Sequence, residues 1–307
     1  MARKRKPTLV DRLEYAAFSA VTAGAGRLSH ERAEKAGAAL GRFGYRRLKI
    51  RRDVVEAQLR QAFPDWDDAK VHATAEAAYA HLGREMMTTL LLSHMSREEV
   101  SGRVRHEVGR ERFYEAYREG NGIVLVGGHF GNWELGAASV AAQGYPVDGI
   151  YQPMRNPLFN DAVVQARRRL GLELIPRAAA SKQALQKLRE GRIVGFVADQ
   201  NAGRSGVFVP FFGRLASTHR GAALLAVRSG APIFAAAAIR QGDHYFGYTE
   251  EITASREGEL DEVVYRLTAA YTAVLEKLVR QWPEQYFWHH RRWKTRPPAE
   301  PNLVKPV

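Results

Sequence analysis

The sequence predicts an α/β fold in which helices cover a largely parallel sheet, with an N-terminal helical extension. From about residue 104, apolar runs of strand length alternate with helical stretches, as in strand–helix–strand units. Two of these runs, Ile-Val-Leu-Val at 123–126 and Ile-Val-Gly-Phe-Val at 193–197, are apolar on both faces, as buried parallel strands are. The first hundred residues read as helices.

The expected organisation is one α/β domain with additions at both ends. Residues 1–100 form the helical extension, 101–297 the α/β core and 298–307 a frayed tail. In the extension, Asp67 and Asp68 begin a helix at 67–92, and Ser96-Arg97-Glu98-Glu99 is a capping-box pattern that begins a short helix.

The core elements follow from the alternation of apolar runs and helical stretches. Strands are expected at 123–126, 147–151, 173–175, 193–198, 232–239 and 245–252. Helices are expected at 133–142, 158–170, 181–190, 219–229 and 259–281. A long loop separates the strand at 193–198 from the helix at 219–229. Its apolar stretch at 207–212 either packs in the core or lines a groove for an apolar ligand.

Composition limits the chemistry and the partners. The 307 residues are 45% hydrophobic, enough for a sizeable core, and include no cysteine. Disulfides, thiolate metal sites and a cysteine nucleophile are therefore excluded. The net charge of +13 points to an anionic partner, which could be nucleic acid, an anionic membrane surface or an acidic protein.

The N-terminus favours contact with a membrane surface. No window approaches the roughly 18 apolar residues of a spanning helix. Arg3-Lys4-Arg5-Lys6 precedes a stretch at 15–26 that is uncharged but short. We interpret this region as an amphipathic helix that lies on an anionic bilayer, preceded by the basic segment 3–6. The alternative is an ordinary surface helix packed on the domain.

His129 and Glu134 are the strongest catalytic candidates. They occur in "VGGHFGNWEL" at 126–135, where a strand ends and a helix begins, the usual place for sites in α/β sheets. A histidine in the loop and a glutamate in the first helical turn can converge, so His129 could act as a general base that Glu134 orients. The alternative is a structural pair that stabilises the helix end. The spacing is not that of a His-Glu-x-x-His metal site.

Four blocks, in order, carry a family resemblance: "GGHFGNWE", "YQPMRNPLFN", "ADQNAGRSGVFVPFFGRLASTHRGAALLAVRSGAPI" and "PEQYFWHHRRWKTRP". They resemble the bacterial lipid A late acyltransferases, also called lauroyl/myristoyl acyltransferases, of the glycerolipid acyltransferase superfamily, over roughly residues 40–297. The sequence "HFGNWE" resembles the His-x-x-x-x-Asp/Glu motif of that superfamily.

The resemblance implies transfer of an acyl chain from acyl carrier protein to a hydroxyl of a lipid A precursor. It implies the cytoplasmic face of the inner membrane as the location, with no metal and no other cofactor. The basic surface would then dock the acidic carrier protein and contact anionic lipid. Acylation of another glycolipid, such as a phosphatidylinositol mannoside, is the alternative within the enzyme class.

Further candidates follow other strands at the same sheet edge. Arg155 could hold a phosphate or the developing oxyanion, and family members often carry arginine where this chain has Gln152. Asp199 and Gln200 end the strand at 193–198. In the Gly-rich loop that follows, Arg204 is a candidate for binding an acceptor phosphate. All four are expected to bind substrate.

The segment 286–294 interleaves aromatic and cationic side chains. That composition suits a membrane interface, and it also suits nucleic acid, whose bases stack on aromatic rings. A basic nucleic-acid-binding protein is therefore the alternative from another class. The chain shows no recognisable binding module for nucleic acid and its cations are dispersed, so no nucleic-acid partner is expected.

Overall fold

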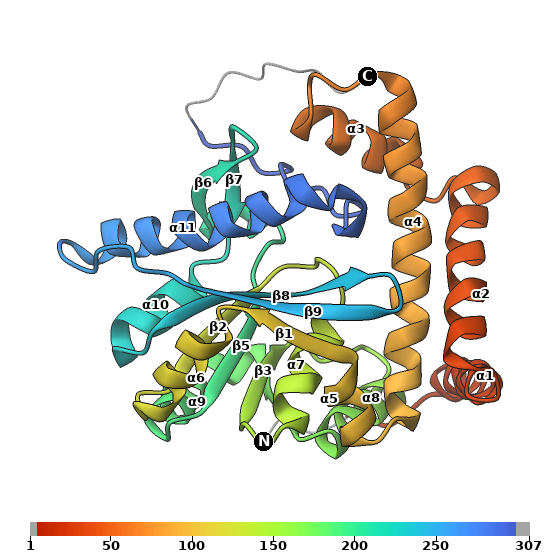
Figure 1. The fold of residues 1–307 in the computed structure, drawn as a ribbon, viewed down its shortest axis with the longest axis horizontal. Helices are drawn as coiled ribbons and strands as arrows, with labels where there is room; N and C mark the ends of the chain where they lie inside the picture. Colours follow the sequence, from red (N-terminus) through yellow and green to blue (C-terminus); the bar gives the residue numbers. More distant parts are fainter. Residues whose placement is uncertain (1–4, 299–307) are drawn as a thin grey trace.

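The protein, a computed structural model describing residues 5–298 apart from the side chains of His106 and Glu107, has the predicted α/β class (Figure 1). The α-helices are α1 Leu9–Ala25, α2 His30–Phe43, α3 Arg52–Ala62, α4 Asp68–Leu91, α5 Arg97–Arg103, α6 Arg110–Arg118, α7 Trp133–Ala142, α8 Pro157–Arg169, α9 Ala180–Arg189, α10 Gly221–Ser229 and α11 Leu260–Gln281. The strands are β1 Val104–Val108, β2 Ile123–Gly127, β3 Val147–Tyr151, β4 Leu172–Pro176, β5 Ile193–Val197, β6 Val207–Phe211, β7 Arg214–Thr218, β8 Ile233–Gln241 and β9 His244–Glu251. Short 3₁₀ or π turns are η1 Gly44–Leu48, η2 Leu92–His94, η3 Arg177–Ala179, η4 Gly203–Ser205 and η5 Pro283–Gln285.

Seven strands form the sheet in the order β1-β9-β8-β2-β5-β3-β4. All neighbours are parallel except β8 and β9, which form an antiparallel pair. The central strands β2 and β5 pair in the register Gly127↔Val197. Their carboxyl ends therefore lie side by side, which confirms that the loops following them share one sheet edge.

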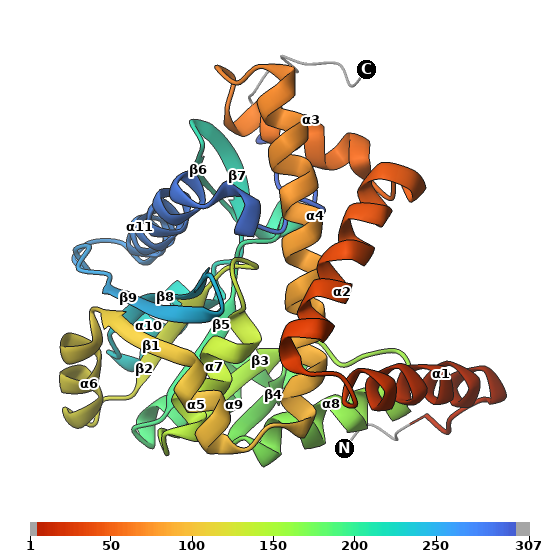
Figure 2. The same cartoon turned by 45° about the vertical axis from the view of Figure 1, so that its right-hand side comes forward.

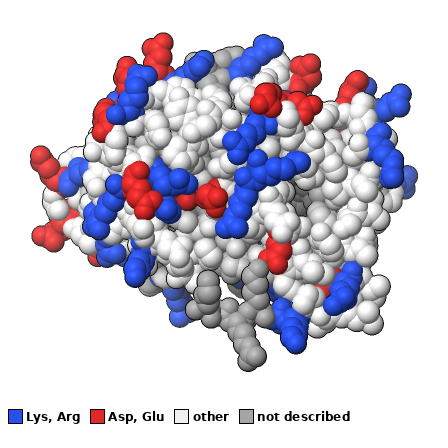
Figure 3. Space-filling model, turned by 90° about the horizontal axis from the view of Figure 1, so that it is seen from below, with Lys and Arg blue, Asp and Glu red and all other residues white. Residues whose placement is uncertain are grey.

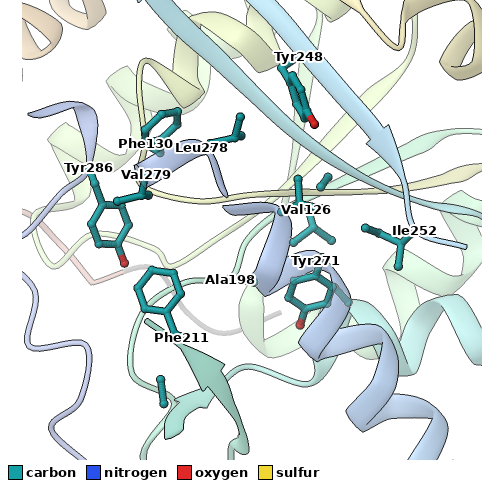
Figure 4. Packing of buried hydrophobic residues seen from close by; sticks show 14 of the residues in the cluster. Val126, Phe130, Ala198, Phe211, Tyr248, Ile252, Tyr271, Leu278, Val279 and Tyr286 are labelled. Carbon is teal, nitrogen blue, oxygen red and sulfur yellow. The ribbon is translucent and has the colours of Figure 1, made fainter. Parts of the chain in front are cut away.

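Helices cover both faces of the sheet, as the apolar strands predicted. Val124 and Val126 pack with residues of α9, α10 and α11, whereas Ile123 and Leu125 pack with residues of α6 and α7. Figure 1 shows α11 on one side of β8 and β9 and α7 on the other. Aromatic side chains extend the first of these cores: Figure 4 shows Tyr286 beside Phe130 and Phe211.

Three segments differ from the sequence prediction. The edge strand β1 and helix α6 were not predicted, because β1 reads Val-Arg-His-Glu-Val and resembles a polar connection. The expected loop after β5 contains the antiparallel hairpin β6–β7. Its two-residue turn, Phe212-Gly213, has positive φ at both positions, as a type I′ turn requires, but it lacks the usual Asn-Gly signal.

Two segments pack largely in the protein interior: the apolar stretch at 207–212 and the aromatic-basic segment 286–294. Phe211 is fully buried. In the C-terminal segment Trp288 and Arg292 are buried, and Arg292 donates to the carbonyl of Ser217 and the hydroxyl of Thr218 at the end of β7. The interpretation of 286–294 as a surface belt is therefore wrong, because Tyr286, Trp288 and Trp293 belong to the main hydrophobic core.

The predicted extension consists of α1 to α5, and α1, α2 and α4 stand beside the sheet (Figure 2). Helices α2 and α4 pack closely because each has a glycine at the contact: a Cβ at Gly37 would lie 2.3 Å from the carbonyl oxygen of Gly83. Helix α1 lies on α8, where the rings of Phe18 and Phe159 are 4.6 Å apart. No helix within residues 5–298 is both long and apolar enough to span a membrane. The predicted tail at 298–307 lies outside the described residues except for its first.

Candidate active site

The register of two strands brings His129 and Asp199 together. Gly127 of β2 pairs with Val197 of β5, and each candidate lies two residues beyond its strand. The Ala198 amide donates to the Gly127 carbonyl at 3.1 Å, so the two chains stay paired for one more residue beyond the ends of the strands. Two side chains far apart in sequence thus meet at one sheet edge.

Asp199 holds His129 through two hydrogen bonds. One carboxylate oxygen lies 2.7 Å from His129 Nδ1, and the other accepts from the His129 backbone amide at 3.0 Å. An ionised carboxylate accepts only, so the ring proton belongs on Nδ1 and the lone pair on Nε2. Asp199 is buried, with 5% of its surface exposed, whereas the His129 side chain is 22% exposed. The accessible nitrogen is therefore basic, as a general base requires.

The charges of the pair stabilise one another. Burial lowers the pKa of His129, but the charge and hydrogen bond of Asp199, and to a lesser degree the charge of Glu134, raise it above its ordinary value. Burial raises the pKa of Asp199, but the His129 charge and hydrogen bonds and the Arg292 charge bring it below its ordinary value. Asp199 is thus ionised at neutral pH and favours the imidazolium that a base forms.

The loop that carries His129 is fixed from two sides. The His129 carbonyl accepts from the amide of Phe287 at 2.9 Å, and the Asn132 amide donates to the carbonyl of Ala238 in β8 at 2.9 Å. Gly131 has φ +57°, and a Cβ there would lie 2.0 Å from the Ala238 oxygen. Glycine is needed at this position because both the backbone angle and the close approach exclude a side chain.

A buried ionic network supports the start of α7. Asn132 caps the helix by accepting from the Leu135 amide and donates its own amide to Glu85 of α4 at 2.8 Å. Glu85 also accepts from Arg240 at 2.7 Å and from Tyr245 at 2.6 Å. Removing one partner of such a network leaves a buried charge unpaired. The helical extension and the sheet are therefore joined directly beneath the candidate site.

Glu134 lies in the first turn of α7 but does not make the predicted hydrogen bond with His129. Its two carboxylate oxygens accept hydrogen bonds from Nε and Nη2 of Arg167, and the distance to Nε is 2.9 Å. The place at Nδ1 that the sequence interpretation gave to Glu134 is taken by Asp199. Glu134 remains close enough for its charge to raise the pKa of His129, so a catalytic role for it stays a prediction.

The other predicted residues separate into two groups. Gln200 lies with the pair, because its side-chain amide is 3.3 Å from His129 Nε2. Arg155 and Arg204 are exposed, and within residues 5–298 neither side chain contacts His129. Arg155 adjoins the N-terminus instead, since its carbonyl accepts from Arg5 at 3.3 Å. Their roles in substrate binding stay predictions.

Comparison with known proteins identifies the family. Residues 3–295 match the family described as bacterial lipid A biosynthesis acyltransferase. The chain belongs to this family. It is 30% identical over 269 residues to the lipid A biosynthesis lauroyltransferase of Escherichia coli (strain K12), which covers 87% of this chain and 86% of that protein. It is 35% identical over 199 residues to the palmitoleoyltransferase of the same strain, covering 64% and 63%.

This chain is therefore an acyltransferase, and membership of the family favours acyl transfer over the nucleic-acid-binding alternative. A phosphatidylinositol mannoside acyltransferase of Mycolicibacterium smegmatis is also similar, at 24% identity over 215 residues, 67% of this chain and 68% of that protein. Among the described residues, no three His, Asp or Glu side chains are grouped so that they could hold a metal ion.

An apolar cavity of about 160 Å³ reaches the site of this acyltransferase. It lies between the sheet and helices α6, α7 and α8, and Trp133, Glu134 and Arg167 line it. The rest of its lining is largely apolar and includes Leu125, Val140 and Leu172. Several strand positions facing it are small, namely Gly127, Gly149, Gly195 and Ala236. Neither His129 nor Asp199 lines the cavity, which approaches them through Trp133, whose ring lies 4.9 Å from that of His129.

Sequence reasoning did not find Arg167 and Glu85. Arg167 stands in the run Arg167-Arg168-Arg169 at the end of α8, which resembles an ordinary basic helix end. Glu85 is one of several polar residues in a long helix. Only the packing of α4 and α8 against the α7 region distinguishes either residue, so no local signal was available.

Proposed function

We propose that this acyltransferase moves a fatty acyl chain from the thioester of acyl carrier protein to a hydroxyl of a lipid A precursor. The observation that carries the proposal is the His129–Asp199 pair at the sheet edge, beside an apolar cavity, in a chain that matches the family from residue 3 to 295. The pair supplies a base, and the cavity supplies room for the chain being moved.

The proposed reaction uses His129 Nε2 as the base. It takes the proton of the acceptor hydroxyl, and the oxygen attacks the thioester carbonyl to form a tetrahedral oxyanion. Asp199 holds the proton on Nδ1 and stabilises the imidazolium, as the carboxylate of a catalytic triad does. When the carbon–sulfur bond breaks, the imidazolium returns its proton to the leaving thiolate. The products are an ester and a free thiol.

Gln200 and Glu134 assist in this proposal. The Gln200 amide lies 3.3 Å from Nε2, so it is placed to donate to the oxyanion when the acceptor occupies Nε2. The negative charge of Glu134 adds to that of Asp199 in favouring the imidazolium. Arg167 holds Glu134 in place through paired hydrogen bonds. Arg155 and Arg204 remain candidates for phosphate groups of the acceptor.

The acyl chain is proposed to lie in the apolar cavity, with Gly195 on its floor. Leu125 and Gly149 flank Gly195 in the sheet, and a Cβ at Gly195 would meet no atom closer than 4.0 Å. A leucine there would occupy space that the far end of the chain uses. One methylene in an apolar pocket changes kcat/KM by roughly 10- to 200-fold.

Gly195→Leu is therefore expected to lower kcat/KM by at least about tenfold for the longest acyl chain used by the wild type, and to spare chains a few carbons shorter. Rates with a series of carrier-protein thioesters of increasing length measure this. Gly102→Leu, at an exposed position with open space around it, is the matched control. An equal loss at every chain length would place the chain elsewhere.

Helix α1 is proposed to contact the cytoplasmic face of the inner membrane. Its packed side faces α8, and its other side exposes Leu9, Val10, Leu13 and Val21, which are 56% to 72% exposed. Seen from below, the right-hand part of the molecule, the side on which α1 lies in Figure 1, shows an uncharged area bordered above and below by charged side chains (Figure 3). An exposed apolar stripe of this kind suits the boundary between head groups and acyl chains. Arg3 and Lys4 of the predicted basic segment 3–6 lie outside the described residues.

Replacing Leu13 and Val21 with aspartate is expected to weaken binding to anionic liposomes by roughly 30-fold, if each side chain contributes about 1 kcal/mol by burial in the interface. Sedimentation with liposomes of known composition measures the binding. Leu260→Asp, at an exposed position that begins α11, is the control. Sedimentation equal to that of the wild type would show that another surface makes the contact.

The choice of acceptor separates the proposal from its alternative. Purified protein, acyl carrier protein thioesters and either a lipid A precursor or a phosphatidylinositol mannoside are incubated, and the lipids are analysed by mass spectrometry. We expect acylation of the lipid A precursor. Acylation of the mannoside alone would favour the second candidate function, which the similarity to the mycobacterial enzyme supports.

A further inference from the structure

The turn between α2 and α3 carries an unusual concentration of positive charge. Residues 42–52, here called the basic turn, contain no acidic residue and six cations: Arg42, Arg46, Arg47, Lys49, Arg51 and Arg52. Two of these are paired, Arg46 with Glu76 at 2.6 Å and Arg52 with Glu56 at 2.6 Å. The other four make no ion pair in the described part of the chain. Their charge is therefore available to a partner.

The basic turn also displays apolar side chains on a strained backbone. Phe43, Leu48 and Ile50 are 51%, 57% and 55% exposed. The segment begins with a π-helical turn at Gly44–Leu48, and both Lys49 and Arg51 adopt left-handed φ angles of 50° and 56°. Each such residue costs about 1–2 kcal/mol relative to ordinary backbone. Backbone strain of this kind persists mainly at functional sites. A protein interface usually has an apolar centre and a polar rim, which exposed apolar side chains surrounded by cations would provide.

The position of the basic turn separates it from the proposed membrane contact. It lies at the opposite end of α2 from α1 (Figure 2). Helix α2 has 14 residues, which corresponds to a length of roughly 20 Å. A bilayer that receives the apolar stripe of α1 therefore lies away from the basic turn. This arrangement favours a soluble anionic partner over lipid head groups.

A row of aromatic side chains connects the basic turn with the catalytic loop. The hydroxyl of Tyr79 donates to the carbonyl of Ile50. The Tyr79 ring lies 4.3 Å from that of His289, which lies 5.1 Å from that of Phe287. The Phe287 amide donates to the His129 carbonyl at 2.9 Å. Each step is a direct contact, so the three aromatic rings form a continuous wall from the basic turn to the catalytic loop.

His289 in this wall has unused hydrogen-bonding capacity. Only 7% of its surface is exposed, and neither ring nitrogen has a hydrogen-bond partner among residues 5–298. Burial lowers its pKa to about 4, so the ring is neutral and offers one donor and one acceptor. A buried polar group without a partner costs about 1–3 kcal/mol, which a ligand with amide groups would recover.

We propose that the basic turn docks the acidic surface of the acyl carrier protein, and that the thioester arm passes along Tyr79, His289 and Phe287 to His129. This inference rests on the proposed function, because it names the surface that receives the proposed donor. The guanidinium group of arginine binds a carboxylate through two parallel hydrogen bonds, and three of the four unpaired cations are arginine. The amide groups of the arm would pair with the two free nitrogens of His289.

The test is a charge reversal of three unpaired cations, Arg42→Glu, Arg47→Glu and Lys49→Glu together. The control reverses Arg118, Arg189 and Arg228, which are exposed at the ends of α6, α9 and α10 and make no ion pair in the described structure. Both variants lose the same formal charge. Binding of the purified carrier protein is measured directly, and initial rates are measured with the carrier-bound donor and with the same acyl chain on free pantetheine.

We expect the basic-turn variant to bind the carrier protein roughly 10- to 100-fold more weakly, with a matching rise in KM for the carrier-bound donor, and the control to stay within about twofold of the wild type. The rate with the small donor should be alike in both variants. His289→Phe should raise KM for both donors, because it affects the arm rather than the docking surface.

Carrier binding by the basic-turn variant equal to that of the control would overturn the proposal. Loss of anionic-liposome sedimentation with intact carrier binding would also overturn it, since the turn would then be a membrane surface. Because binding is measured without turnover, wild-type binding without acyl transfer would contradict the proposed function and still support docking. If the wild type did not bind the carrier protein, the docking proposal would be contradicted.

Discussion

His129→Ala is expected to lose roughly 10²- to 10⁴-fold in kcat, the usual contribution of a positioned general base. Asp199 holds the proton on Nδ1, so Nε2 is the basic atom of the His129 ring, and the His129 side chain is 22% exposed. Initial rates with a carrier-protein thioester and a lipid A precursor measure the loss. The KM values for both substrates should change little, because His129 acts on the proton transferred during the reaction rather than on binding.

A control for folding accompanies this variant. The backbone of residue 129 is held by Asp199 and Phe287 through its amide and carbonyl, which alanine retains. The thermal unfolding midpoint and carrier-protein binding should therefore remain near the wild-type values. Wild-type turnover by the folded variant would refute the mechanism.

Asp199→Asn is expected to lower kcat by about 10⁴-fold, as the equivalent exchange does in a serine protease, because the amide holds the wrong tautomer of the histidine. The same variant tests the electrostatics. A base must be neutral, so activity rises as pH passes upward through the pKa of His129, which the Asp199 charge holds above the ordinary value of 6.5. With that charge removed, the remaining activity should begin to rise at a lower pH.

Glu134→Gln provides the matched comparison. Its charge contributes less than that of Asp199 to the raised pKa of His129, and its carboxylate pairs with Arg167 rather than with the imidazole. We expect a smaller loss in kcat than for Asp199→Asn and a smaller shift of the pH profile in the same direction. Glu134→Asp, which keeps the charge, should retain more activity than Glu134→Gln. If Glu134→Gln lost more than Asp199→Asn, Glu134 would be the orienting residue.

The sequence predicted that His129, Asp199 and Gln200 follow strands at one sheet edge, but it also placed Arg155 and Arg204 with them, and the structure does not bring those two to His129. Strand lengths and the glycines around His129 located the loop, and the same argument placed Asp199 and Gln200 after the neighbouring strand. The partner of His129 was predicted from nearness along the chain, which favoured Glu134. The choice of Asp199 depends instead on the register Gly127↔Val197. The strands β2 and β5 are separated along the chain by three helical connections, so their register is a property of the assembled sheet.

The remaining differences have a similar origin. Segment 286–294 resembles a surface belt because aromatic and cationic residues alternate along it, yet Trp288 and Arg292 are buried against β7 and α3. An arginine can be buried when carbonyl and hydroxyl oxygens surround it, and those oxygens come from Ser217 and Thr218. A composition pattern does not contain that information.

The most direct test of the account follows both products of one reaction. Wild-type protein and His129→Ala are incubated with a lipid A precursor and carrier protein bearing an isotopically labelled acyl chain. Labelled lipid is quantified by mass spectrometry, and free carrier thiol is quantified in the same sample. For the wild type we predict equal amounts of free thiol and of lipid A precursor that has gained one labelled chain. In the variant we predict a loss of both products. Free thiol without labelled lipid, or equal labelled lipid from both proteins, would contradict the account.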